Sequence, residues 1–243
     1  MNLKILSGIV ILSSLFAQSV LAADAKSAPE TGWGGEAEVG ILMTRGNTNT
    51  DSQNIKLGVR YSTEKWEHKL KLEYLRTEDN GVVSADKFGG DYRSTYRFSA
   101  LDYGFGAVRY EKDRFAGFDR RTTENLGYGR KLYNEKKFKW DVEAGVGARQ
   151  TNYTDNTDDN EGIVRLATNL KWQMTDTSSL KEELFVEHGS INTLTQSTTS
   201  LTVKINASLA MKLGLKVQDN SNVPPGIKHT DTETALTLVY DFL

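Results

Sequence analysis

The chain has 243 residues, and its 30 lysines and arginines nearly balance 32 aspartates and glutamates, for a formal net charge of -2. This balance argues against a dedicated nucleic-acid-binding protein, which usually carries a strong basic excess. Hydrophobic residues make up only 38% and cysteine is absent. A bundle of membrane-spanning helices, disulfides and cysteine-based sites are therefore excluded, and no cofactor is expected.

The first residues have the pattern of an export signal. The basic residue Lys4 precedes an uncharged, mainly apolar run over residues 5–20, and Val20-Leu21-Ala22 offers small or modest side chains to a signal peptidase. We expect a signal peptide at residues 1–22, a short periplasmic segment at 23–32 and the folded domain at 33–243. An uncleaved anchor helix is the alternative, disfavoured because polar residues interrupt the short apolar run.

Apolar and polar residues alternate along most of the folded domain. From Trp66 to Tyr74 the even-numbered residues are mostly apolar, whereas every odd-numbered residue is Glu or Lys. Segments 55–61, 138–148 and 209–217 have the same period of two. This period indicates a strand with one apolar and one polar face, because successive side chains of a strand point to opposite sides.

Twelve segments are predicted to be strands, each close to the roughly 9–11 residues that a tilted strand needs to cross a bilayer. Alternation is unclear in 103–112, 121–132 and 162–172, so the faces of these three strands are left unassigned. The predicted strands are 33–44, 52–62, 66–77, 88–98, 103–112, 121–132, 138–151, 162–172, 179–188, 196–206, 209–218 and 230–242.

The predicted connections alternate in length. Short ones are expected near 63–65, 99–102, 134–137, 175–177 and 207–208, and long polar ones near 45–51, 78–87, 113–120, 152–161, 189–195 and 219–229. Short turns at one end and long loops at the other are typical of outer-membrane barrels. The sequence therefore predicts an all-β, antiparallel up-and-down transmembrane β-barrel of about 12 strands, with both ends of the domain on the periplasmic side.

A soluble sheet would alternate in the same way, so further features are needed to favour a membrane barrel. The apolar faces end in aromatic residues, as interfacial girdles do, and the polar faces carry charged residues within the strands. The aromatic residues are Trp66, Tyr74, Phe138, Trp140, Tyr240 and Phe242. With the export signal, these features predict a location in the bacterial outer membrane. The expected partners are outer-membrane lipids and lipopolysaccharide, the barrel-assembly machinery during insertion, and small solutes.

Four segments carry a family resemblance. They are Gly35–Gly40 leading into Thr44-Arg45-Gly46-Asn47-Thr48, the run from Tyr110 to Gly117, Gly127-Tyr128-Gly129, and the closing Val239-Tyr240-Asp241-Phe242. In these features the chain resembles the YdiY-like family of salt-induced outer-membrane proteins (DUF481) over essentially the whole mature sequence. The resemblance implies a β-barrel in the outer membrane and an association with osmotic stress. It implies no reaction, because the family has no established activity.

The charged residues of the polar faces are the candidate lining of the lumen. Acids and bases are nearly equal in number, which favours charges paired across the interior over a strongly ion-selective pore. Two alternatives stay open: a salt-bridged, largely occluded barrel that supports the envelope, and a narrow, weakly selective channel. The candidate lining residues are Glu36, Glu38, Lys56, Arg60, Lys69, Lys71, Glu73, Arg93, Arg97, Asp141, Glu143, Arg149, Glu183, Lys204, Lys212 and Lys216.

A lipid-acting enzyme is a further alternative. His188 and Ser190 are two residues apart in a predicted strand, so the imidazole is placed to activate the hydroxyl. The arrangement is similar to the His-x-Ser of outer-membrane phospholipases, but the Asn expected on the next strand would fall near Thr202, which is not Asn. We therefore expect no enzymatic activity. A surface receptor or adhesin built on the loops is another alternative.

Two polar stretches have weaker functional signals. The acidic run 155–161 has the charge to attract a divalent cation but lacks the pattern of a calcium loop, so no metal site is predicted. The mixed-charge segment 111–121 is predicted to brace a loop, with contact to lipopolysaccharide phosphates as the alternative.

Overall fold

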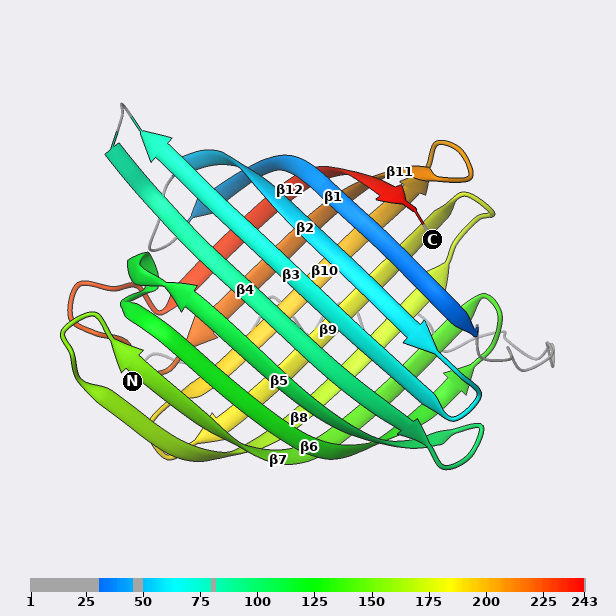
Figure 1. Ribbon diagram of the computed structural model, residues 1–243, viewed down its shortest axis with the longest axis horizontal. Helices are drawn as coiled ribbons and strands as arrows, with labels where there is room; N and C mark the ends of the chain where they lie inside the picture. Colours follow the sequence, from blue (N-terminus) through cyan, green and yellow to red (C-terminus); the bar gives the residue numbers. More distant parts are fainter. Residues whose placement is uncertain (1–30, 46–49, 80–81, 243) are drawn as a thin grey trace, which may run out of the picture.

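The computed structural model describes residues 31–45, 50–79 and 82–242, which form a closed antiparallel barrel (Figure 1). The predicted signal peptide, and all but the end of the predicted segment 23–32, lie outside the described residues. Within these ranges, no helix is both long and apolar enough to cross a membrane.

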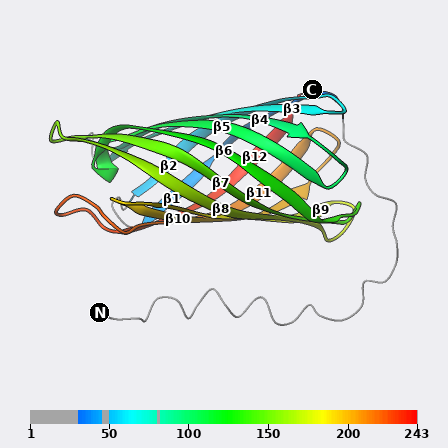
Figure 2. The same cartoon turned by 90° about the horizontal axis from the view of Figure 1, so that it is seen from below.

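The described residues form twelve strands. Each pairs antiparallel with its neighbour in sequence, and β1 pairs with β12, which closes the barrel and leaves no free edge. The predicted up-and-down barrel of about 12 strands is confirmed, and the strands are strongly inclined to its long axis (Figure 2). The strands are β1 Gly32–Arg45, β2 Thr50–Ser62, β3 Trp66–Asp79, β4 Val82–Arg97, β5 Asp102–Asp113, β6 Phe118–Asn134, β7 Phe138–Tyr153, β8 Asp158–Gln173, β9 Ser178–Gly189, β10 Thr193–Lys204, β11 Leu209–Asn220 and β12 Thr230–Asp241.

The outer face of the barrel is apolar. Leu126, Val146 and Leu166 are 70%, 62% and 58% exposed, and the alternate residues of the same strands point into the barrel. Exposure of large aliphatic side chains to water is unfavourable by about 25 cal/mol per Å². Aliphatic side chains of this kind are suited to lipid hydrocarbon, although β9 and β10 also carry the polar group of Glu182, Ser197 and Thr199 on this face.

Aromatic side chains gather at both ends of this outer face. At the short-turn end, the ring centroids of Trp66 and Tyr96 are 4.8 Å apart, and Tyr133 stacks on Trp140 at 5.9 Å. Tyr74 of the predicted girdle lies toward the other end, directly opposite Phe88. Two aromatic belts separated by aliphatic side chains are typical of transmembrane barrels.

Pairing between strands explains the faces that the sequence left unassigned. On β5, Tyr103 and Phe105 are buried and point inward, each directly opposite a glycine of β6. A Cβ added to Gly129 would lie 2.2 Å from Tyr103 Cζ, and one on Gly127 would lie 2.5 Å from Phe105 Cζ. The two rings therefore cover these glycines, which no larger residue could replace without displacing a ring.

Most of the predicted long loops are shorter in the structure than predicted. β4 begins at Val82 rather than residue 88, and β8 begins at Asp158 rather than residue 162, so the hairpins continue well into the predicted loops 78–87 and 152–161. Both faces of an antiparallel ladder can meet water, so backbone pairing continues where the apolar alternation ends. The connections that remain at this end include η3 (Arg114–Ala116) with Gly117, residues 190–192 and residues 221–229 (Figure 1).

Candidate functional site

The charged lumen is the candidate functional site. Arginines, carboxylates and aromatic rings pack closely against the inner faces of β5 to β8, whereas lysines on β2, β3 and β9 keep much of their side chains accessible. We call these two regions the packed half and the lysine-bearing half of the lumen.

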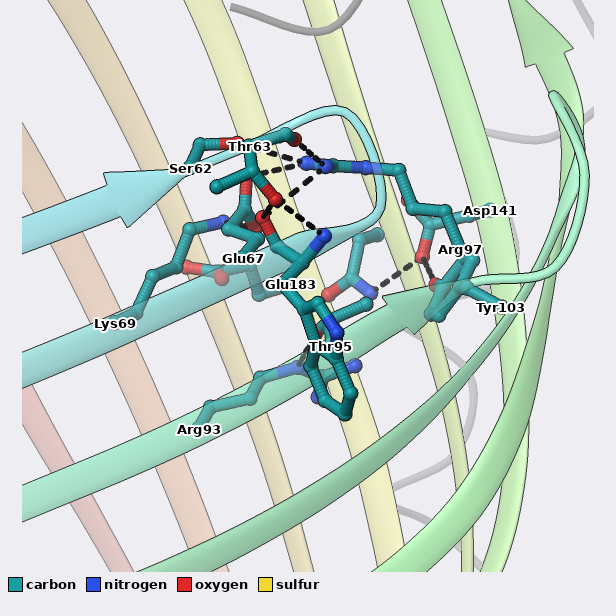
Figure 3. Close-up of polar contacts among 12 residues, drawn as sticks. Ser62, Thr63, Glu67, Lys69, Arg93, Thr95, Arg97, Tyr103, Asp141 and Glu183 are labelled. Carbon is teal, nitrogen blue, oxygen red and sulfur yellow. Dashed lines mark hydrogen bonds and ion pairs between the residues drawn. The ribbon is translucent and has the colours of Figure 1, made fainter. Parts of the chain in front are cut away.

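Arg93 and Tyr103 bind carboxylates in the part of the packed half that is closer to the short turns (Figure 3). Arg93 on β4 makes two contacts with Glu143 on β7, Nη2 to Oε1 at 2.5 Å and Nη1 to Oε2 at 3.3 Å. The Tyr103 hydroxyl lies 2.8 Å from Asp141 Oδ2 and 2.9 Å from Glu143 Oε1, so two carboxylates compete for one proton. The Arg93 guanidinium also stacks 4.0 Å from the Phe105 ring.

A buried charge cluster lies in the same packed half, closer to the long-loop end of the barrel. Glu187 on β9 is 0% exposed and accepts from Arg109 Nη2 at 2.7 Å and from Arg165 Nη1 at 2.6 Å. Asn125 Nδ2 donates to the same carboxylate at 3.3 Å, and the Phe185 ring lies against both guanidiniums. Arg109 and Arg165 are missing from the predicted lining because the alternation of apolar and polar residues is unclear in their strands. In the register they lie opposite the acids Asp91 and Glu187 of the neighbouring strands.

Arg149 and Glu161 fill the lumen near the long-loop mouth. Arg149 is 2% exposed, and its Nε and Nη2 lie 2.9 and 2.5 Å from Glu161 Oε1. The other oxygen of Glu161 accepts the backbone N–H groups of Ile191 and Asn192 at 2.7 and 3.1 Å, and Arg149 donates to the Asn192 carbonyl. The connection 190–192 is thereby drawn inward over the packed half.

The connection 221–229 lies over this turn. The backbone N–H of Asn222 donates to Asn192 Oδ1 at 3.0 Å. A Cβ added to Gly117, in the β5–β6 connection, would lie 3.0 Å from Pro224 Cγ. Because β5 and β6 are far from β11 and β12 around the barrel, this contact spans the mouth. We call residues 190–192 and 221–229 the lid.

Lysines and glutamates on the other inner faces remain accessible. The side chains of Lys56 and Lys181 are 38% and 41% exposed, and those of Glu73 and Glu183 are both 36% exposed. The ion pairs are Lys56–Glu73 at 3.7 Å and Lys181–Glu183 at 2.9 Å. Side chains that point into a closed barrel and keep this exposure must border an internal space that water enters.

Other ion pairs cross or rim this space. Lys87 on β4 contacts Glu233 on β12 at 3.0 Å, and Lys212 on β11 contacts Glu38 on β1 at 2.6 Å. At the short-turn mouth, Arg97 Nη1 donates to the Thr63 carbonyl at 2.7 Å, and Nη2 contacts Glu67 at 3.1 Å; Lys69 contacts the same glutamate at 2.7 Å (Figure 3). The remaining candidates lie at inner positions of the register: Glu36 beside Gly58, Arg60 beside Gly34, Lys71 opposite Asp91, Lys204 opposite Ala210 and Lys216 opposite Glu233.

The alternative catalytic pair is not brought together. His188 is exposed on the outer face, and its Nδ1 lies 2.8 Å from Thr193 Oγ1 rather than from Ser190. The expectation that Thr202 lies beside this pair is wrong: Thr193 is opposite His188, and Thr202 is opposite Ser179 at the far end of the hairpin. An antiparallel hairpin pairs the residues nearest its turn, which sets this register.

The acidic run 155–161 is not a metal centre in this structure. Within the described ranges, no group of three or more His, Asp or Glu side chains is placed to hold a metal ion. Asp155 accepts hydrogen bonds from the Thr157 backbone N–H and hydroxyl, at 3.0 and 2.6 Å, whereas Glu161 points into the lumen toward Arg149.

Residues 37–242 match the family model described as "Protein of unknown function, DUF481". The chain belongs to this family. It is also 28% identical over 207 residues to "Uncharacterized protein YdiY" of Escherichia coli (strain K12), covering 85% of this chain and 82% of that relative. The expected family resemblance is confirmed, and neither match carries an assigned activity.

Solved outer-membrane barrels share the fold. The NanC porin superimposes with a TM-score of 0.59 at 7% identity, covering 85% of this chain and all 100% of that one. The translocator domain of the autotransporter NalP from Neisseria meningitidis superimposes with a TM-score of 0.56 at 11% identity, covering 88% of this chain and 90% of that domain. The COG4313 outer membrane channel from Pseudomonas putida F1 superimposes with a TM-score of 0.52 at 13% identity, covering 92% of this chain and 100% of that channel. At these identities the likeness concerns architecture only.

Proposed function

We propose that this protein is an outer-membrane barrel that passes small polar solutes through the lysine-bearing half of its lumen, beside a wall braced by arginine. The observation that carries the proposal is the 36–41% exposure of Lys56, Glu73, Lys181 and Glu183 inside a closed barrel. Two of the structural relatives are named as a porin and as an outer membrane channel, which supports the same role.

The expected selectivity is weak. The accessible lysines Lys56 and Lys181 each have a glutamate within 4 Å, so the two signs of charge offset each other along this part of the path. A pore lined by one sign of charge would instead reject ions of that sign. The packed half contributes rigidity, because its charges are engaged in the Arg93–Glu143 and Arg109–Glu187 contacts.

Planar-bilayer recording tests the proposal. The purified barrel is expected to give small current steps in KCl and a reversal potential near zero in a KCl gradient. Replacing Lys71 and Lys181 by Glu is expected to shift the reversal potential toward cation selectivity, because both lie at inward-facing positions, Lys71 opposite Asp91 and Lys181 2.9 Å from Glu183. The matched control, Lys136→Glu, changes an exposed turn residue outside the lumen. Absence of current steps above a protein-free bilayer would contradict a channel and leave a structural envelope role.

Shortening the lid provides a second test of the proposed channel. Shortening the connection 221–229 removes the contacts to Asn192 and Gly117 that hold it across the mouth. The conductance of the variant with the shortened connection is expected to rise. Its reversal potential is expected to stay unchanged, because this connection lies at the long-loop mouth, away from Lys71 and Lys181. Unchanged conductance would show that the lid does not limit the path.

A further inference from the structure

A second pocket, separate from the lumen, opens on the outer surface at the long-loop end. Its volume is about 400 Å³, and it lies between the outward sides of β5, β6 and β7 and the β7–β8 turn. Its lining includes Tyr110, Lys112, Arg114, Arg120, Asn152 and Tyr153.

Positive charge is concentrated in this pocket. Three cationic side chains line it, Lys112, Arg114 and Arg120, against one carboxylate, Asp119, which is paired with Arg114 at 2.8 Å. Arg120 Nε donates to Asn152 Oδ1 at 2.9 Å, which orients the guanidinium. Among the described residues, neither Lys112 nor Arg120 takes part in an ion pair.

The nearby acid of the β7–β8 turn is directed elsewhere. Asp155 accepts both the backbone N–H and the hydroxyl of Thr157, so its carboxylate is engaged within its own turn. The residues that line the pocket carry three positive charges and one negative charge, an excess suited to one compact anionic group.

Farther from the pocket, beyond the exposed Glu124 of β6, the outward face of the barrel becomes apolar. Tyr110 lies at its edge, and Val108 follows on the same outward face of β5. On the neighbouring strands, Leu126, Val146 and Val164 are 70%, 62% and 53% exposed. A molecule seated with an anionic group between the arginines would lay apolar chains along this wall.

We propose that the pocket binds the phosphorylated headgroup of a lipid of the outer leaflet, with its acyl chains against the outward faces of β5 to β8. This inference rests on the outer-membrane location proposed above. Arginine and lysine form short, charge-assisted hydrogen bonds to phosphate oxygens, and the planar guanidinium can bind two oxygens at once. The site adjoins the Phe88–Tyr110 aromatic pair at the long-loop end of the barrel, the level at which headgroups are expected.

Diphosphoryl lipid A is a suitable probe, with native mass spectrometry of the folded barrel in detergent as the readout. The wild-type protein is expected to retain diphosphoryl lipid A and to lose most of this occupancy with dephosphorylated lipid A, a comparison that needs no variant. The double variant Lys112→Gln, Arg120→Gln is expected to bind diphosphoryl lipid A about tenfold more weakly, equivalent to about 1.4 kcal/mol. The control pair, Lys136→Gln with Lys137→Gln, removes two exposed lysines at the opposite end.

Inorganic phosphate separates a lipid site from a site for soluble anions. Phosphate at the concentration of the lipid is not expected to displace lipid A, because it lacks contacts with the apolar wall. Displacement at equal concentration, equal retention of the dephosphorylated lipid, or unchanged binding by the Gln pair would each overturn the proposal. Lipid occupancy and bilayer conductance are measured independently, so a barrel that binds lipid A but passes no current would contradict only the channel.

Discussion

Replacement of Glu187 by Gln is expected to destabilise the barrel strongly. Glu187 is completely buried and neutralises Arg109 and Arg165, at 2.7 and 2.6 Å. The amide has nearly the same shape but no charge, so Arg165 loses its ion-pair partner and Arg109 keeps only Glu111, at 3.3 Å. Loss of one partner of a buried ion pair costs about 3–5 kcal/mol. Because Arg109 and Arg165 are 16% and 14% exposed, water screens part of this cost, and we expect about 3 kcal/mol.

Glu183 provides the matched control. It lies four residues earlier on the same strand and the same face, but its side chain is 36% exposed and its partner Lys181 is 41% exposed. Glu183→Gln is therefore expected to cost at most about 1 kcal/mol, as for other solvated ion pairs.

The assay is equilibrium urea unfolding of the barrel in lipid vesicles, followed by tryptophan fluorescence. Adding Arg165→Gln to Glu187→Gln is expected to recover part of the lost free energy of unfolding, because it removes one uncompensated charge. Equal losses for Glu187→Gln and Glu183→Gln would refute the reasoning, since burial would then have no bearing on the cost. A loss below about 1 kcal/mol for Glu187→Gln would show that water enters the cluster freely.

Three further changes test the glycine contacts and the β7–β8 turn. Gly129→Ala places a Cβ 2.2 Å from Tyr103 Cζ, so unfolding in urea is expected to become easier by roughly 1–3 kcal/mol; a neutral effect would contradict the ring–glycine contact. Gly117 has φ +89° and supports the lid, so Gly117→Ala is expected to increase conductance with little change in global stability; unchanged conductance would argue against the contact across the mouth. Hydrogen bonds from the Thr157 hydroxyl and backbone N–H hold the pKa of Asp155 below its usual value of about 3.9. The carboxylate therefore stabilises the turn above that value, and the benefit is lost as pH falls through the lower folded pKa. Hydrogen-exchange protection of the Thr157 amide should be constant from pH 5 to 7 and fall in acid; a pH-independent protection would contradict this assignment.

The arrangement of the strands was predictable because its signal is local. Trp66 to Tyr74 alternates strictly, and the residues that the alternation assigns to the outside, Leu70 and Tyr74, are 43% and 44% exposed on the barrel surface. The prediction failed in extent where β4 and β8 continue beyond the membrane-facing region, because water on both faces removes the alternation without breaking the backbone ladder.

Alternation along a strand indicates which side chains point inward, because the period of two is a property of the extended backbone alone. It carries no information about which inward charges meet. Arg109 and Glu187 are 78 residues apart in sequence and lie on strands that are not neighbours. Only closure of β1 on β12 at a set register brings such groups within 3 Å and leaves Lys56 and Lys181 accessible, since the distance across a barrel depends on strand number and stagger together.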